Sequence, residues 1–141
     1  MYSLTALPTT ILLVLMSVAP GILIAWYVYS RDRYEKEPRH LLVGCFLLGM
    51  LGVVPPVMVE ILVNMVGFQK STDIVHLFVH AFFVVALVEE STKFFILTRY
   101  AYPKEDFNEP FDGITYSVMV SMGFATLENL MYVLSLSLIH I

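Results

Sequence analysis

Four long apolar stretches constrain the fold of this chain more than any other feature of its sequence. They cover residues 9–29, 40–66, 74–97 and 114–141. Each is near or above the roughly 20 residues that a helix needs to cross a bilayer. The sequence therefore predicts an all-α, polytopic membrane protein built as a bundle of about four transmembrane helices.

The composition supports a membrane protein rather than a soluble one. Of the 141 residues, 58% are hydrophobic and only 14% are charged, which is too apolar for an ordinary soluble domain. The connections between the stretches are short, so we expect residues 1–141 to form a single transmembrane domain. The first stretch lacks a basic leader and a cleavage site before Pro20 and Gly21, which favours a retained helix over a signal peptide. A net charge of −4 gives no indication of a nucleic-acid partner, and we expect none.

The basic residues of the connections predict the orientation in the membrane. The first connection holds four of them, Arg31, Arg33, Lys36 and Arg39. The third connection holds Arg99 and Lys104, and the second holds only Lys70. Loops that are rich in lysine and arginine stay in the cytoplasm. We therefore expect a multi-pass protein of the cell membrane whose first and third connections are cytoplasmic and whose N-terminus lies outside.

Three charges interrupt the third apolar stretch. In VVALVEESTKFFIL, residues 84–97, Glu89 and Glu90 are followed by Lys93. An ionisable residue in the middle of a membrane helix costs at least ~2.5 kcal/mol, so it marks a functional site or a buried partner. Lys93 can reach back to either glutamate along one helical face and neutralise it. The other carboxylate, held close to a like charge in a low dielectric, suits general acid–base chemistry. The alternative is a structural ion-pair cluster that fastens this helix to its neighbours.

A second polar group interrupts the fourth stretch. GFATLENLMYV, residues 123–133, carries Glu128 and Asn129. At 1.5 Å per residue, Glu90 and Glu128 lie about 14 and 22 Å from the cytoplasmic side, a difference that helix tilt can close. We expect Glu89 or Glu90 to face Glu128 across one polar cavity that holds a water molecule. Alternatively, Glu128 and Asn129 act as interhelical hydrogen-bonding groups.

Other polar residues of the apolar stretches are weaker candidates. His76 and His80 have a spacing that can bind zinc. However, His80 lies about 13 Å from Glu89 along a helix and about half a turn out of phase, so structural roles are expected for both histidines. Glu60 lies near the outer end of the second helix, where we assign it a structural or gating role. Asp112 is expected to cap the N-terminus of the fourth helix.

Small residues and prolines shape the second stretch. Pro55 and Pro56 are predicted to kink its helix, and such a break can admit water or a substrate segment. Gly44, Gly49 and Gly52 are expected to allow close helix packing. The single Cys45 excludes an internal disulfide.

Three blocks of the sequence resemble the PrsW family of intramembrane proteases, which are distantly related to the CAAX-processing proteases. Glu89-Glu90-x-x-Lys93 matches the EExxK signature of that family. RDRYEKEP, residues 31–38, resembles its charged block after the first helix, and FDGITYSVMVSMGFATLENLMY, residues 111–132, its second core block. The three blocks occur in the family's order in a hydrophobic chain, and the resemblance covers most of residues 31–132.

The resemblance implies an intramembrane peptide hydrolase that cleaves membrane-associated proteins. The catalytic residues would be Glu89, Glu90 and Glu128, with Lys93 and Asn129 in support. The implied substrate is a single-span membrane protein such as an anti-sigma factor. A zinc-dependent and a metal-free glutamate mechanism both remain open, so the cofactor is unknown. Two alternatives are a small proton- or cation-coupled transporter that uses the same carboxylates and a noncatalytic membrane scaffold.

The last six residues suggest that the end of the sequence is encoded by a sequencing adapter and not by the gene. Leu136-Ser137-Leu138-Ile139-His140-Ile141 is the translation of a common transposon-end sequencing adapter, CTGTCTCTTATACACATC. We therefore expect residues 136–141, His140 included, not to be native. Relatives carry a histidine on a later helix, which is absent from this sequence. Residues 1–141 would then be an inactive fragment of a larger protease domain.

Overall fold

The computed structural model describes residues 6–31, 36–67 and 72–139. Within these ranges the chain is helical and contains no strand, which confirms the all-α prediction. The elements in chain order are α1 (Ala6–Arg31), α2 (Arg39–Leu51), α3 (Val54–Met65), α4 (Ile74–Val79), η2 (His80–Ala86), α5 (Leu87–Ile96), η3 (Leu97–Ala101) and α6 (Pro110–Ile139).

These elements form four segments that are long and apolar enough to cross a membrane. The segments are Thr10–Arg31, Arg39–Met65, Ile74–Ala101 and Pro110–Ser135. They agree with the four predicted stretches to within a few residues at most ends. The chain is therefore a multi-pass membrane protein.

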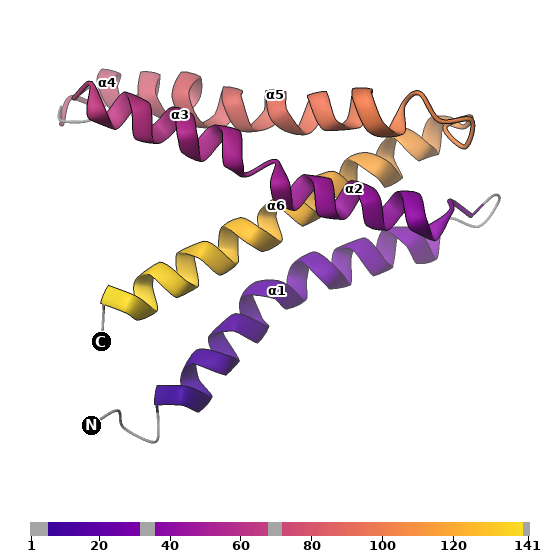
Figure 1. Cartoon of the computed structure of the whole chain (residues 1–141), viewed down its shortest axis with the longest axis horizontal. Coiled ribbons are helices and arrows are strands. Elements are labelled where there is room, and N and C mark those ends of the chain that lie inside the picture. Colours follow the sequence, from indigo (N-terminus) through magenta and orange to yellow (C-terminus); the bar gives the residue numbers. More distant parts are fainter. Residues whose placement is uncertain (1–5, 32–35, 68–71, 140–141) are drawn as a thin grey trace.

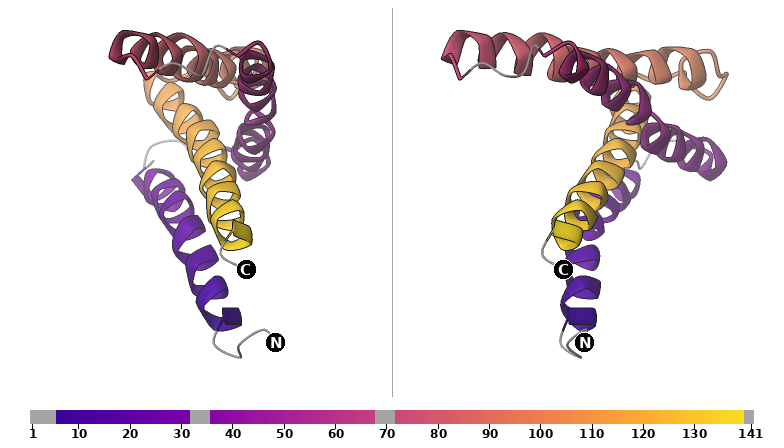
Figure 2. Two further views of the ribbon diagram at one scale, coloured as in Figure 1. Left: turned by 90° about the vertical axis from the view of Figure 1, so that its left-hand side faces the viewer. Right: turned by 60° about the vertical axis from the view of Figure 1, so that its left-hand side comes forward.

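The four spans converge at one end of the molecule. Figure 1 shows α1, α2, η3 and the start of α6 close together at the end that holds the first and third connections. Helix α6 packs against both α1 and α2, while α3 packs against η2 and α5. At the opposite end, α1 and α6 diverge from the third span (Figures 1 and 2).

The buried core lies near the convergent end. It consists of apolar residues from α2, η3 and α6, namely Leu41, Leu42, Cys45, Ala101, Tyr116, Met119 and Val120. Helices α2 and α6 cross with their backbones in contact, because a Cβ atom at Gly49 would overlap the Val120 carbonyl and one at Gly123 would overlap the Phe46 carbonyl. This confirms the predicted packing role of Gly49 and adds a glycine on α6.

A buried polar contact ties the first connection to α6. Glu37 is 5% exposed and accepts a hydrogen bond from the hydroxyl of Tyr116, which is fully buried. Asp112, one turn earlier on α6, accepts hydrogen bonds from the backbone amides of Asn108 and Glu109 at 2.8 and 2.6 Å. The prediction that Asp112 is the N-cap is wrong in position, because α6 begins at Pro110. Its carboxylate reaches back from inside the first turn instead.

The second span is broken, as Pro55 and Pro56 predicted. Helix α2 ends at Leu51 and α3 begins at Val54. The two prolines occupy the first turn of α3, where their missing amide hydrogens cost nothing, but where they cannot continue the hydrogen bonds of α2. Figure 2 shows the resulting change of direction. The break turns α3 toward the third span.

The third span alternates between two helical forms. The π-helical segments η2 and η3 flank the ten-residue α5, which carries Glu89, Glu90 and Lys93. His80 is buried in η2 and His76 is partly buried in α4. Single π turns inside helices are rare and often occur at functional sites.

Candidate active site

Three carboxylates from three elements line one pocket. The pocket has a volume of about 320 Å³ and lies between α3, η2, α5 and α6. Its charged residues are Glu60, Glu89 and Glu128, and its other lining residues are Val53, Pro56, Val57, Val85, Phe124, Met131, Tyr132 and Ser135. Glu89 and Glu128 thus share a cavity across the interface of the third and fourth spans, as the sequence predicted.

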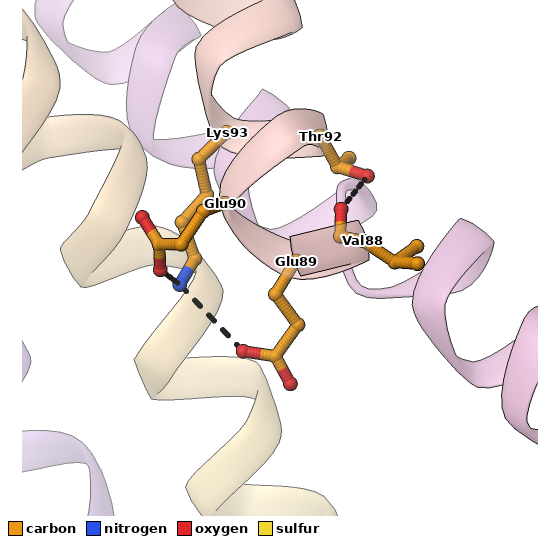
Figure 3. A network of polar contacts seen from close by, with 5 residues as sticks. All are labelled: Val88, Glu89, Glu90, Thr92 and Lys93. Atoms are coloured by element: carbon orange, nitrogen blue, oxygen red, sulfur yellow. Dashed lines mark hydrogen bonds and ion pairs between the residues drawn. The ribbon is translucent and has the colours of Figure 1, made fainter. Parts of the chain in front are cut away.

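Lys93 contacts Glu90 more closely than Glu89. Its Nζ donates a hydrogen bond to Glu90 Oε1 at 2.7 Å and lies 3.7 Å from Glu89 Oε2 (Figure 3). The Glu90 side chain is 71% exposed and lines a separate small pocket, whereas that of Glu89 is 20% exposed. Glu90 is therefore the direct partner of the lysine, and Glu89 is the carboxylate presented to the three-carboxylate pocket.

The position of Lys93 is fixed by the neighbouring helix. Its Nζ lies 4.3 Å from the ring centroid of Phe124, a buried residue of α6. A cation over an aromatic face gains about 0.5–2 kcal/mol, more when it is shielded from water. This contact joins the glutamate-bearing α5 to the helix that carries Glu128.

The groups of the pocket interact electrostatically as a set. The carboxyl group of Glu128 interacts with the charges of Glu89 and Lys93. Tyr132, one helical turn after Glu128, interacts with the carboxylates of Glu128, Glu60 and Glu89. Two or more carboxylates in one low-dielectric cavity can share a proton, which is the arrangement that acid–base chemistry on a bound water requires.

Glu60 belongs to the pocket, although we assigned it a structural or gating role. Val53, Pro56, Val57 and Glu60 follow one another at helical spacing on one face of α3 and all line the cavity. The break before α3 turns this face toward Glu89. The spacing from the proline pair to Glu60 was the available signal, because it places the glutamate one turn beyond a predicted opening in the helix.

Other predicted residues lie elsewhere. Asn129 is exposed and is not among the residues that line the pocket, since it projects from α6 about 100° away from Glu128. His76 and His80 do not line the pocket either, and the structural roles expected for them stay a prediction. His140 lies outside the described residues.

The described side chains do not by themselves fit a resident metal ion. In residues 6–31, 36–67 and 72–139, no three histidine, cysteine, aspartate or glutamate side chains are grouped closely enough to hold one.

Comparison with known proteins gives one consistent set of relatives. The chain is 39% identical over 123 residues to the protease PrsW of Geobacillus kaustophilus, 36% over 123 residues to that of Bacillus subtilis and 37% over 126 residues to that of Shouchella clausii. These matches cover 87%, 87% and 89% of this chain, and 52%, 54% and 56% of the respective relatives. The chain thus spans about half the length of the curated relatives it matches. No solved structure matches it.

A family model described as PrsW family intramembrane metalloprotease matches residues 37–140. The match includes Glu60, Glu89, Glu90, Lys93 and Glu128, the charged residues of the candidate site. It extends from the buried Glu37 to one residue past the end of α6. The chain belongs to the PrsW family of intramembrane proteases.

Proposed function

We propose that this chain carries the catalytic centre of an intramembrane protease, in which glutamates activate water to cleave peptide bonds of membrane-associated proteins. The observation that carries the proposal is the shared pocket of Glu89 and Glu128, which come from different helices. Each carboxylate costs at least ~2.5 kcal/mol at the centre of a membrane helix. Three of them around one cavity, in a protein of this family, are best explained by chemistry that needs them.

Glu89 is the proposed general base. It faces the cavity, and its nearest cation is 3.7 Å away, whereas Glu90 is engaged at 2.7 Å by the same lysine. A carboxylate that is bound directly to an ammonium group is a weaker base than one that is not. Lys93 thus sets the charge state of the pair, and Glu90 holds Lys93 away from the base.

Glu128 is the proposed partner of Glu89 across the cavity. Glu89 takes a proton from a water molecule as the water oxygen bonds to the scissile carbonyl carbon. Glu128, holding the proton that the two acids share, donates a hydrogen bond to the carbonyl oxygen as negative charge develops there. The carbon–nitrogen bond then breaks, and the proton taken by Glu89 passes to the leaving nitrogen. Removal of a general base typically lowers the rate 10²- to 10⁴-fold.

The substrate reaches this pocket from within the bilayer. Val53 lies at the break between α2 and α3, and Val53, Pro56 and Val57 form one wall of the cavity. A break in a membrane helix that lines a polar cavity can admit water and an unwound peptide segment. We propose a single-span membrane protein as the substrate. An anti-sigma factor is the example that the family resemblance implies.

The proposed orientation places the N-terminus outside the cell membrane. The first and third connections carry most of the basic residues and lie at the same end of the molecule (Figure 1). Two basic connections on one side agree with a single cytoplasmic face. The three-carboxylate pocket includes Val85 and Glu89, which lie near the middle of the third span.

Cleavage of a membrane-anchored test substrate tests this function. The complete protein and its Glu89→Gln and Glu128→Gln variants are reconstituted with the substrate, and the products are identified by mass spectrometry. The control is Glu105→Gln, which removes a carboxylate from the exposed third connection. Cleavage by the wild type and the control, but not by the other two variants, is expected. Ion flux without cleavage would instead indicate a transporter. Activity lost to a chelator and restored by zinc would show that a metal supplies the activated water.

A further inference from the structure

A second cavity of the molecule is almost entirely apolar, and no carboxylate lines it. It has a volume of about 340 Å³ and runs between α1, α2 and α6. Its lining residues are Ile22, Ala25, Trp26, Tyr29, Arg39, Leu42, Val43, Phe46 and Met119. None of these residues lines the pocket of Glu89 and Glu128. We refer to this cavity as the α1–α2 groove.

One end of the α1–α2 groove is cationic. Arg39, at the start of α2, is exposed, and its Nε donates a hydrogen bond to the hydroxyl of Tyr29 at 3.3 Å. Lys36 is exposed as well, and its Nζ lies 5.6 Å from the centroid of the same tyrosine ring. Among the described residues, the ion pairs involve Lys93 alone, so no described carboxylate neutralises either cation. An apolar groove therefore ends at a pair of positive charges.

The groove covers about two thirds of the depth of one leaflet of a bilayer. Its lining residues extend from Tyr29 back to Ile22 on α1 and from Arg39 to Phe46 on α2. Seven residues of helix cover about 10 Å. Half of a hydrocarbon core of about 30 Å is about 15 Å. A spanning helix would need contacts along the whole core, whereas an acyl chain that enters from one boundary would fill this groove.

We propose that the α1–α2 groove is a binding site for a phospholipid with an anionic headgroup. An acyl chain occupies the apolar length beside Trp26 and Phe46. The phosphate and any further negative charge of the headgroup lie against Arg39 and Lys36. Arginine suits this role because its planar guanidinium presents several donors to phosphate oxygens. The site is independent of proteolysis, since none of its residues takes part in the proposed reaction.

Trp26 provides a reporter for this site. It is the single tryptophan of the chain, is 65% exposed and lines the groove. The chain is reconstituted in two sets of phosphatidylcholine vesicles. One set contains a small fraction of brominated phosphatidylglycerol, and the other contains the same fraction of brominated phosphatidylcholine. The brominated acyl chains quench tryptophan fluorescence on contact. Two basic side chains near a membrane surface each contribute about fivefold to the attraction of an anionic lipid. We expect brominated phosphatidylglycerol to associate five- to twentyfold more strongly than brominated phosphatidylcholine.

Matched variants separate a specific site from general attraction to the membrane. Arg39→Gln should lower the preference at least fivefold, whereas Arg99→Gln, which removes an exposed arginine beside Phe95 on the third span, should not change it. Ala25→Phe fills the groove and should weaken quenching by both lipids, while Ala86→Phe, at an exposed position elsewhere, should not. If Arg39→Gln fails to insert, Lys36→Gln removes the other cation of the same end of the groove and should lower the preference about fivefold.

Two results would overturn the proposal. Equal quenching by the two brominated lipids in the wild type would show that the groove does not select anionic headgroups. A preference that survives Arg39→Gln, or that falls equally with Arg99→Gln, would place the attraction outside the groove.

Discussion

Replacing Glu90 with glutamine should inactivate the site indirectly, by leaving Lys93 to pair with Glu89. In the wild-type chain the ammonium of Lys93 is shared, at 2.7 Å from Glu90 and 3.7 Å from Glu89. Glutamine keeps the shape of Glu90 but not its charge. Lys93 then has one carboxylate within reach on its own helix, and that carboxylate is the proposed base.

The expected size of the effect follows from these distances. Two unit charges about 4 Å apart attract by about 4 kcal/mol at an effective dielectric constant of 20. The side chains of Lys93 and Glu89 are 17% and 20% exposed, so the solvent screens them only in part. In the wild type the closer contact of Lys93 with Glu90 offsets part of this attraction. If Glu90→Gln releases a third to two thirds of it to oppose protonation of Glu89, turnover falls about ten- to hundredfold, at about 1.4 kcal/mol per factor of ten. Glu89→Gln removes the base itself and should cost 10²- to 10⁴-fold.

A double substitution distinguishes the two roles. Lys93→Met alone should weaken cleavage without abolishing it, because the base remains. Glu90→Gln combined with Lys93→Met should recover activity to within about tenfold of Lys93→Met, since no cation is left to bind Glu89. Glu89→Gln combined with Lys93→Met should stay as inactive as Glu89→Gln. These variants are compared by initial rates of cleavage of the membrane-anchored substrate, at equal amounts of inserted protein.

The reasoning is refuted if Glu90→Gln with Lys93→Met is no more active than Glu90→Gln, because Glu90 would then act directly in the reaction. Near wild-type turnover in Glu89→Gln would exclude Glu89 as the base. The signature EExxK would in that case reflect a structural ion pair, which is the alternative that its spacing also allows.

Three further predictions concern orientation, the third carboxylate and helix packing. A cysteine at the exposed Ser30 should resist an impermeant thiol reagent on intact cells, and labelling there would reverse the proposed topology. Glu60→Gln should lower turnover about tenfold or more. Asn64→Ala, at an exposed position one turn further along α3, should leave turnover unchanged. Equal effects of the two substitutions would show that Glu60 has no specific role in the site. Gly123→Ala should destabilise the fold by about 1–3 kcal/mol, because the new Cβ overlaps the backbone of α2. Gly113→Ala is the control, because its Cβ meets Phe107 at an ordinary 3.5 Å, and it should leave the free energy of unfolding unchanged or raise it by up to about 1 kcal/mol. Both variants are unfolded by denaturant in detergent, and equal stabilities would contradict the packing argument.

The spans were predictable from the sequence because hydropathy and length decide them. Pro55 and Pro56 also revealed the break in the second span, since a proline pair cannot continue a helix. The order of the helices in space was not predictable, because apolar helices in lipid have no hydrophobic preference for one another. Their arrangement depends on local backbone contacts such as that of Gly123 with Phe46, and these require the structure.

The candidate site was predictable in part. Glu89 and Glu128 stood out because charges are costly in apolar helices, and the structure places both in one pocket. The sequence could not decide between Glu89 and Glu90, since Lys93 reaches both. Glu60 was missed because its direction depends on the break before α3, and Asn129 was included because adjacency in sequence hides the 100° turn between neighbouring helical positions.

The backbone contact between α2 and α6 has a consequence for how this family can evolve. A clash between two side chains can be relieved by a second substitution that makes one of them smaller. At Gly49 and Gly123 the opposing atoms are main-chain carbonyls, which no substitution can shorten. These two positions should therefore accept almost no change through divergence, whereas pocket walls such as Val57, Val85 and Met131 can exchange volume with one another. The lining of the pocket can therefore change among distant relatives while the crossing of the two helices is inherited intact.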